Sequence, residues 1–314
     1  MSVLDGYLKS LKPLEIEEPI DVWVHRPLAY LLALALYPTP VSPNAVTAFS
    51  ILCGCAAGIA MVWDFQHHML IAGFCIFMSA VIDCADGQLA RMRKTSSAFG
   101  RMLDGAADAI VSFVIVAGGA WVIITSHTDS VVKLAIFAPL VVLTAVTGSF
   151  HTGGYDFYKN LFLRLTNPNY QEGEDLVTAT RRRKEQTATE SFLMKRVWWI
   201  YLYYIESHDN FGKWFDPFSA RRINALPPYD ENRAAIYRKY AGTSMMWWRS
   251  FFGFGSMIFQ FAFFTALDAL DWFVVLRGIG MNLFYIGYLR PLQQKASKKA
   301  FAAMGIDPSA LSRP

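Results

Sequence analysis

Long apolar stretches separated by short polar segments dominate the pattern of this chain. Each stretch is close to the ~20 residues that a helix needs to cross a bilayer. Six transmembrane helices are predicted, over residues 43–63, 68–90, 99–125, 131–157, 246–267 and 272–289. A soluble bundle would carry a polar stripe at helical period, and residues 109–125 carry almost none. The pattern therefore predicts an all-α, polytopic membrane protein.

The polar parts of the chain divide it into five predicted regions. These are an N-terminal cytoplasmic or interfacial segment over 1–42, the first four spans over 43–159, an insertion over 160–245, the last two spans over 246–290, and a basic cytoplasmic tail over 291–314. Ser42-Pro43-Asn44 predicts the start of the first span, because proline is tolerated in the first turn of a helix.

Two further stretches are expected to form helices along the membrane surface. Residues 26–37 are apolar but too short to span a bilayer. Residues 191–218 interleave aromatic and basic side chains, which is typical of a segment near acidic lipid headgroups. Such interleaving also occurs in proteins that bind nucleic acid, but the neighbouring spans argue against that partner. Residues 1–25 lack the apolar run of a cleavable signal peptide.

Charge adds an orientation to this layout. Only 17% of the residues are charged, against about 25% in soluble domains. Three short loops, 64–67, 125–130 and 268–271, contain no Lys or Arg. The basic residues gather on the other side, including Arg91, Arg93, Lys94, Arg101, the run 181–184, Lys295, Lys298 and Lys299. Because Lys and Arg concentrate in cytoplasmic loops, we expect both termini and the 91–101 loop to be cytoplasmic.

Four aspartates are the chemically unusual residues of the predicted spans. Asp83 and Asp86 lie near the end of the second span, and Asp104 and Asp108 near the start of the third. Ionisable residues at membrane depth are costly and mark functional sites by default. Their spacings of three and four place each pair on one helix face. The short intervening loop makes the helices antiparallel neighbours, so the four carboxylates can converge and hold one or two divalent ions.

Small residues and one arginine accompany the aspartates. Gly87 and Gly100 allow close approach of a ligand or another helix, and Ala90 is a further small side chain. Arg91 can offer a bidentate fork to a phosphate oxygen. Carboxylates, metal and arginine together at a cytoplasmic membrane surface favour phosphoryl transfer from a pyrophosphate.

The spacing of these residues resembles the signature of the CDP-alcohol phosphotransferase family. The matching string is Asp83-x-x-Asp86-Gly87-x-x-Ala90-Arg91, eight residues, then Gly100-x-x-x-Asp104-x-x-x-Asp108, and all eight specified positions agree. Pro43-Asn44-x-x-Thr47 also resembles the start of the family's first span. The motif covers residues 83–108, and the six-span layout extends the resemblance over most of the chain. The 160–245 insertion is longer than in compact members of the family.

The resemblance implies a membrane transferase that uses two divalent metal ions, Mg²⁺ or Mn²⁺. An acceptor hydroxyl attacks the phosphorus of a CDP-linked donor on the side away from cytidine, and CMP leaves. By position, Asp83, Asp86 and Asp104 are expected to be metal ligands, and Asp108 to complete the metal site or act as general base. Gly87, Ala90 and Gly100 would shape the nucleotide pocket, and Arg91 would contact donor phosphate. The resemblance also implies a homodimer.

The motif leaves the substrates open. Transfer of a phosphatidyl group from CDP-diacylglycerol to a small polar alcohol is the favoured interpretation, in phospholipid synthesis at the cytoplasmic face. The alternative is transfer of a headgroup from CDP-choline or CDP-ethanolamine to diacylglycerol. A cation- or proton-coupled transporter is the alternative from another class. Its ion path should reach the outer face, whereas all four motif acids lie toward the inner one.

Several other residues have two interpretations each. Arg93, Lys94 and Arg101 either mark topology or grip a phosphate-bearing substrate, and Arg277 either snorkels or pairs with an acid at a helix end. The polar end of the fourth span lines an acceptor site or forms an interfacial belt; its residues are His151, Tyr155, Asp156, Tyr158 and Lys159. His67 and His68 are predicted on the opposite membrane face, without a special role. The cysteines lack metal-site spacing and are predicted to be packing residues: Cys53, Cys55, Cys75 and Cys84.

Overall fold

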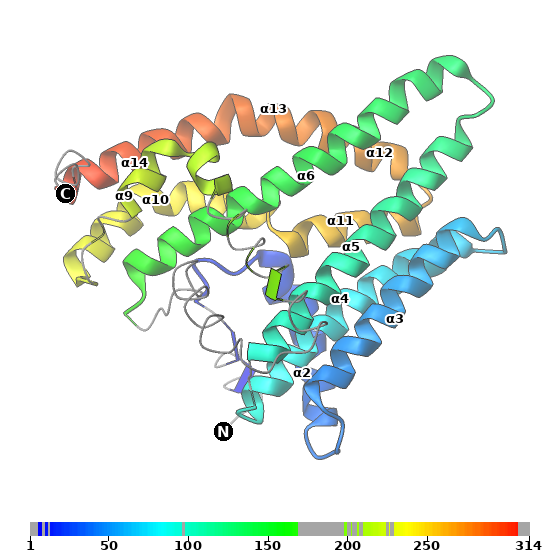
Figure 1. Cartoon of the computed structure of the whole chain (residues 1–314), viewed down its shortest axis with the longest axis horizontal. Helices are drawn as coiled ribbons and strands as arrows, with labels where there is room; N and C mark the ends of the chain where they lie inside the picture. Colours follow the sequence, from blue (N-terminus) through cyan, green and yellow to red (C-terminus); the bar gives the residue numbers. More distant parts are fainter. Residues whose placement is uncertain are drawn as a thin grey trace. The chain divides into compact units, whose positions relative to one another are not determined.

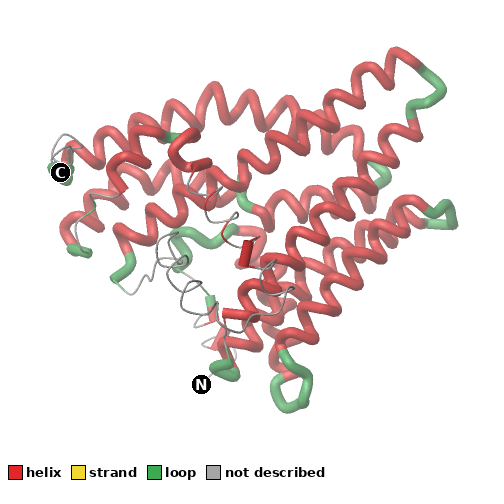
Figure 2. The backbone as a smooth tube through the Cα atoms, viewed as in Figure 1, coloured by secondary structure: helices red, strands yellow, loops and turns green. Residues whose placement is uncertain are grey.

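The described part of the chain is built from helices and loops (Figure 2). This computed structural model describes residues 6–7, 10–11, 13–95, 98–168, 198–199, 202, 206, 210–223, 226 and 229–306, without the side chains of residues 98, 99, 101, 102 and 104. The predicted all-α class is confirmed. Most of the predicted insertion, including the run 181–184 and much of 191–218, lies outside the described residues.

The described helices follow one another along the chain (Figure 1). Their bounds are η1 Asp21–His25, α2 Arg26–Leu36, α3 Pro43–Val62, α4 His68–Met92, α5 Ala98–Ser126, α6 Val131–Thr166, α9 Pro217–Ile223, α10 Glu231–Phe251, α11 Phe254–Ala266, α12 Leu270–Val275, η2 Leu276–Met281, α13 Asn282–Phe284, η3 Tyr285–Leu289 and α14 Arg290–Ala303. The η elements are π-helical turns that continue the neighbouring helices.

The chain divides into two compact units. The first comprises Met1–His151 and Trp247–Tyr288, and the second comprises Thr152–Met246 and Leu289–Pro314. The boundaries fall within α6, within α10 and inside the last π-helical turn. The family-like motif at residues 83–108 lies wholly in the first unit.

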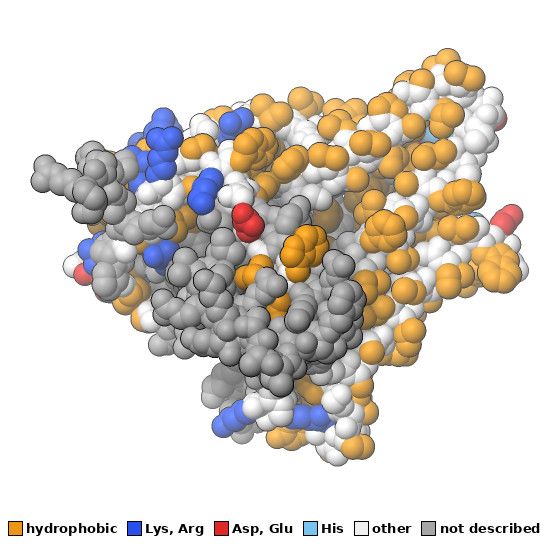
Figure 3. Space-filling model, viewed as in Figure 1, with side chains coloured by type: hydrophobic (Ala, Val, Ile, Leu, Met, Phe, Trp, Pro, Cys, Tyr) orange, Lys and Arg blue, Asp and Glu red, His pale blue; other side chains and the backbone are white. Residues whose placement is uncertain are grey.

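Five helical stretches of the described residues are long and apolar enough to cross a membrane. They are Pro43–Val62, His68–Met92, Gly105–Ser126, Val131–Thr166 and Leu270–Ala303. Figure 3 shows many hydrophobic side chains on the face of the molecule in view. Phe49, Phe113 and Val132 are large apolar side chains of the spanning helices that are exposed. An outward apolar surface of this extent fits a lipid environment. The chain is an integral membrane protein.

The predicted span over 246–267 is not a single helix, and the predicted count of six spans is not confirmed. Helix α10 ends at Phe251 and α11 begins at Phe254. The 13 residues of α11 extend over roughly 20 Å. That length falls short of the ~30 Å hydrocarbon core. The apolar run in the sequence hid this break, because its residues stay apolar on both sides of Gly253.

Helix α3 begins as the sequence predicts. The Ser42 side-chain oxygen accepts a hydrogen bond from the Ala45 N–H at 3.2 Å, and Pro43 occupies the first turn. Such a cap satisfies a donor that the helix itself leaves unpaired. The helix ends at Val62, and a tight connection through His67, with its positive φ of 61°, leads into α4.

Small residues let the spanning helices approach closely. Gly54 and Gly58 of α3 face Val111 and Val114 of α5, and a Cβ at Gly58 would lie 2.3 Å from Val114 Cγ1. Gly73 of α4 faces the backbone of α11 in the same way. Small residues spaced by four are typical of membrane helix contacts, where packing replaces the hydrophobic effect. Three of the cysteines, Cys53, Cys75 and Cys84, pack at the edges of the two cores as predicted.

Helix α2 packs along α4 through its small side chains. Ala29 and Ala33 are fully buried against Val81, Ala85 and Leu89. The other face of α2 exposes leucines. This one-sided burial fits the predicted position along the membrane surface, and it brings the preceding residues 17–26 beside the motif end of α4.

Candidate active site

A cavity of about 190 Å³ lies in the first unit, beside the motif ends of α4 and α5. Asp83 and Asp108 both line it, so each of the two motif helices contributes a carboxylate to one volume. Ser50 of α3 and Ser79 of α4 line it as well, and the Ser79 hydroxyl donates to the Ser50 carbonyl at 2.8 Å. The remaining polar lining comes from the N-terminal segment: Glu18, Asp21, His25 and Arg26.

Asp86 points to α3 rather than into this cavity. Its carboxylate is buried and accepts a hydrogen bond from the Thr47 hydroxyl. Thr47 belongs to the Pro43-Asn44-x-x-Thr47 string, so the start of the first span is tied to the motif by a side-chain contact. The contact holds the Asp86 carboxylate in place against α3.

The carboxylates fit a hard divalent cation by their chemistry, since Mg²⁺ and Mn²⁺ prefer oxygen ligands. Among the described side chains, no three His, Cys, Asp or Glu residues lie close enough together to hold an ion. Asp104 belongs to α5, but its side chain lies outside the described set. The four-carboxylate metal site therefore stays a prediction.

Gly87 and Arg91 are neighbours on α4. A Cβ at Gly87 would lie 3.4 Å from Arg91 Nη1, so the missing side chain leaves room for the guanidinium. Ala90 is half-buried on the same helix, and Gly100 lies in the first turn of α5. The small residues of the motif thus lie where its two helices end and begin.

Arg93 forms hydrogen bonds to backbone carbonyls that the sequence did not indicate. Its guanidinium donates to the carbonyls of Leu36 at 2.6 Å, Thr39 at 2.8 Å and Tyr37 at 3.1 Å, and to that of Val41. These carbonyls follow the C-terminus of α2, where a cation is favourable. Arg93 therefore fixes the α2–α3 connection, and its two predicted roles stay predictions.

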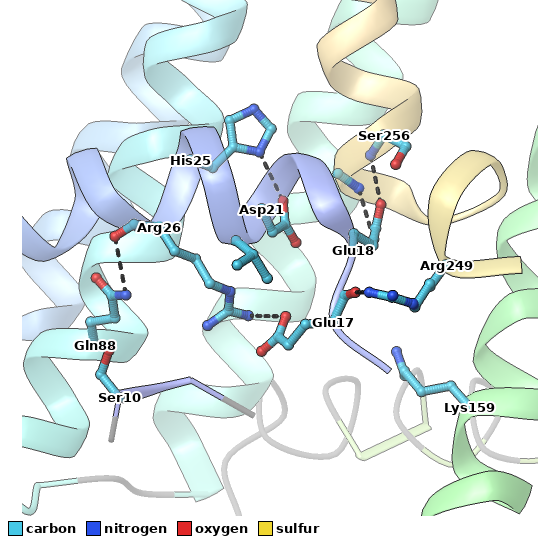
Figure 4. Close-up of polar contacts among 12 residues, drawn as sticks. Ser10, Glu17, Glu18, Asp21, His25, Arg26, Gln88, Lys159, Arg249 and Ser256 are labelled. Carbon is cyan, nitrogen blue, oxygen red and sulfur yellow. Dashed lines mark hydrogen bonds and ion pairs between the residues drawn. The ribbon is translucent and has the colours of Figure 1, made fainter. Parts of the chain in front are cut away.

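The N-terminal segment contributes charged residues that sequence reasoning missed (Figure 4). Glu17 pairs with Arg26 at 3.2 Å, and Asp21 pairs with His25 at 2.8 Å. Glu18 accepts hydrogen bonds from the N–H groups of Gly255 and Ser256, at 3.1 and 2.6 Å. The one available signal was the density of acids in residues 15–21 just before an apolar stretch. Their partners are too distant in sequence to be inferred from it.

Two glycines make the docking of this segment possible. A Cβ at Gly253 would lie 2.0 Å from the Glu18 carboxyl carbon, and one at Gly255 would lie 2.3 Å from Asp21 Oδ1. Carboxylates are favourable at the N-terminus of a helix, where unpaired N–H groups carry partial positive charge. Glu18 thus caps α11 at the break between α10 and α11.

Arg277 binds the other end of the break between α10 and α11, the C-terminus of α10. It is 1% exposed, and its Nη1 donates to the carbonyl oxygen of Phe251, the last residue of α10, at 2.8 Å. The predicted snorkelling is wrong, because the side chain is buried. The alternative of an acid at a helix end agrees with Glu18, which caps α11 and whose charge acts on Arg277. A cation at a helix C-terminus is favourable for the same reason as an anion at the N-terminus.

Most of the polar end of α6 is buried, although the Asp156 side chain stays 43% exposed. His151 is 2% exposed and packs edge-on against Phe252, with ring centroids 4.6 Å apart. In the second unit, the buried Tyr158 hydroxyl donates to Asp216 at 2.8 Å, and Asp156 pairs with Lys159. Neither His151 nor any residue of 152–159 is among the described lining of the cavity.

Thr47→Val removes the hydroxyl that donates to Asp86. A hydrogen bond to a charged group is worth about 1.5–3 kcal/mol, and we expect its loss to lower the rate of the transfer that the family resemblance implies by about tenfold. Thr47→Ser keeps the hydroxyl and should keep most of the activity. The initial rates of CMP release by the two purified variants test this expectation. Equal rates for Thr47→Val and the wild type would contradict a role for the Thr47–Asp86 contact.

The pKa of Glu18 is raised to about 7, mainly by burial and further by the charge of Asp21, against the opposing hydrogen bonds of Ser256 and Gly255. In the unfolded chain, Glu18 loses its proton near its ordinary pKa of 4.5, which is at lower pH than in the folded chain. Stability should therefore fall by roughly 1–3 kcal/mol as pH rises from about 4.5 to 7, and then level off.

Glu18→Gln should remove this part of the pH dependence. Thermal midpoints of the detergent-solubilised protein across that pH range measure it. Glu15→Gln, at an exposed position of the same segment, is the matched control and should follow the wild-type curve. A Glu18→Gln curve parallel to that of the wild type would contradict the expectation.

Comparison with known proteins agrees with the motif. Residues 40–153, just over a third of the chain, match the family model described as CDP-alcohol phosphatidyltransferase. This region contains all eight motif positions, and its match to the family model confirms the resemblance. A curated relative is the phosphatidylinositol phosphate synthase of Mycobacteroides abscessus, 29% identical over 90 residues. The match covers 29% of this chain and 40% of that relative, so the chain spans less than half of the relative's length.

Proposed function

We propose that the chain is a metal-dependent transferase that moves a phosphatidyl group from CDP-diacylglycerol to the hydroxyl of a small polar alcohol, with release of CMP. The observation that supports this most is the shared cavity, into which α4 and α5 of the family-like region bring Asp83 and Asp108. The curated relative's name, a phosphatidylinositol phosphate synthase, favours a phosphatidyl product over transfer of a headgroup to diacylglycerol.

The motif residues divide into ion-holding and proton-handling groups in this proposal. Asp83, Asp86 and Asp104 would hold two divalent cations, together with Asp108. When bound, such ions would supply positive charge against the charge that develops on the donor diphosphate. Asp108 takes the proton of the acceptor hydroxyl, whose oxygen then attacks the phosphorus next to the lipid. Arg91 contacts donor phosphate, and Gly87, Ala90 and Gly100 leave room for the nucleotide.

The site is proposed to face the cytoplasm, into which the CMP product would be released. The support is the charge asymmetry of the loops: Arg91, Arg93 and Lys94 follow the motif end of α4, whereas the 64–67 loop at its other end has no Lys or Arg. A homodimer is part of the proposal by family resemblance alone.

The decisive assay measures CMP release by the detergent-solubilised or nanodisc-embedded protein. CDP-diacylglycerol and CDP-choline are each offered with a panel of acceptors, with Mg²⁺, with Mn²⁺ and with EDTA. Release of CMP from CDP-diacylglycerol that EDTA abolishes supports the proposal. Release from CDP-choline with diacylglycerol would assign the headgroup-transfer reaction, and no release from either donor would overturn the transferase.

A further inference from the structure

Arg26 brings a positive charge into a cavity whose described lining also carries four acidic side chains. The described lining includes four carboxylates, those of Glu18, Asp21, Asp83 and Asp108. Arg26 is the one Arg or Lys among the same described lining residues. An anionic diphosphate entering this volume meets strong repulsion from the carboxylates, so a fixed cation near them would favour its binding.

The guanidinium of Arg26 is held in place but not fully used. The residue is 8% exposed, and its Nη2 pairs with the buried carboxylate of Glu17 at 3.2 Å (Figure 4). Its backbone carbonyl accepts a hydrogen bond from Gln88 of the motif helix at 3.3 Å. The Nε donor is buried and has no partner among the described residues. Buried donors left unpaired are costly, and a ligand oxygen would remove that cost.

Arginine suits a phosphate because its planar fork offers two parallel donors to two oxygens. Glu17 uses one edge of the fork and thereby fixes its orientation before a ligand binds. Arg249 anchors the same segment from α10, through a 2.9 Å hydrogen bond from its Nη1 to the Glu17 carbonyl, but it is not among the cavity lining. The N-terminal segment is thus docked from both sides with Arg26 at the cavity.

We propose that Arg26 binds the diphosphate of the cytidine-linked donor, so that the N-terminal segment forms part of the donor site. The proposal rests on the proposed function and deepens it. It adds to the motif a phosphate-binding residue 57 positions before Asp83 in the chain. The acceptor does not contact Arg26 in this arrangement, and its affinity is independent of the guanidinium.

The test compares donor and acceptor kinetics of Arg26→Lys and of Glu17→Gln/Arg26→Gln with the wild type. The double variant removes both members of the buried ion pair, so that no unpaired charge remains in the core. Both variants should raise the KM for the donor by about 10- to 100-fold, the loss of one charge-assisted contact, with the acceptor KM unchanged. Arg249→Gln is the comparison variant, because it loosens the segment without removing the cavity guanidinium, and it should raise the donor KM less than either Arg26 variant does.

A donor KM unchanged in both Arg26 variants would overturn the proposal. So would equal changes of donor and acceptor KM in the Arg26 variants and in Arg249→Gln, because a loosened segment would then explain them. A second measurement is the dissociation constant of CDP in the presence of Mg²⁺, which should rise similarly in both Arg26 variants. If the wild type releases no CMP, the proposed function fails, and CDP binding alone then decides whether Arg26 recognises the diphosphate.

Discussion

Asp108→Asn is expected to reduce turnover by about 10²- to 10⁴-fold, the contribution of a general base to a proton transfer. The asparagine side chain has nearly the same shape, and Asp108 is only half-buried beside the cavity, so the fold should be retained. Rates of CMP release at saturating donor and acceptor measure the effect. A melting temperature within a few degrees of the wild type would show that the loss is chemical.

The matched control for Asp108→Asn is Asp64→Asn. Asp64 lies in the α3–α4 connection and its side chain is fully exposed. The same change of charge there should leave turnover unchanged. Near-normal turnover of Asp108→Asn would contradict its assignment as the base, and would leave ion holding by the other motif aspartates as the role to examine.

Gly73→Ala is expected to cause a large loss of stability in the first unit. The new Cβ would lie 2.6 Å from the carbonyl oxygen of Ala262 and 2.6 Å from the backbone nitrogen of Ala266. Backbone atoms of a packed helix cannot move aside as a flexible side chain does. Overpacking of this kind costs about 1–3 kcal/mol or more, and it would push α11 away from α4.

Gly242→Ala supplies the comparison for that loss. A Cβ at Gly242 of α10 meets no described atom within 4 Å. Alanine there should be neutral or stabilising by up to ~1 kcal/mol, since glycine inside a helix is the poorer residue. Thermal unfolding followed by tryptophan fluorescence in one detergent compares the two variants. Equal midpoints for both would mean that α4 and α11 are not in close contact.

The sequence predicts the motif helices well because their signals are local. Apolar runs of spanning length define α3, α4 and the start of α6, and Ser42-Pro43-Asn44 defines a helix start that a side-chain hydrogen bond completes. Aspartate spacings of three and four fix which residues share a helix face. The convergence of Asp83 and Asp108 follows from these spacings and from a short loop.

The remaining features depend on contacts between residues far apart in the chain. Nothing local in Glu17-Glu18 shows that one carboxylate would pair with Arg26 and the other cap α11. The break at Gly253 lies inside an apolar run, so hydropathy alone joins α10 to α11 as a single span. Arg277 likewise looks like an isolated charge until the α10 carbonyl that it binds is known. Such features follow from tertiary structure and have no periodic signal.

The capped break between α10 and α11 also bears on how the protein is made. Glu18 precedes Gly255, its partner, by 237 residues, so it leaves the ribosome long before α11 does. Unpaired N–H groups at the start of α11 would be costly in lipid. The Glu18 carboxylate, which is already synthesised, can accept hydrogen bonds from them once α11 has inserted. Arg277 is synthesised later still. The Glu18 contact to α11 can therefore form as soon as α11 is made, whereas the Arg277 contact to α10 has to wait for the helix that follows.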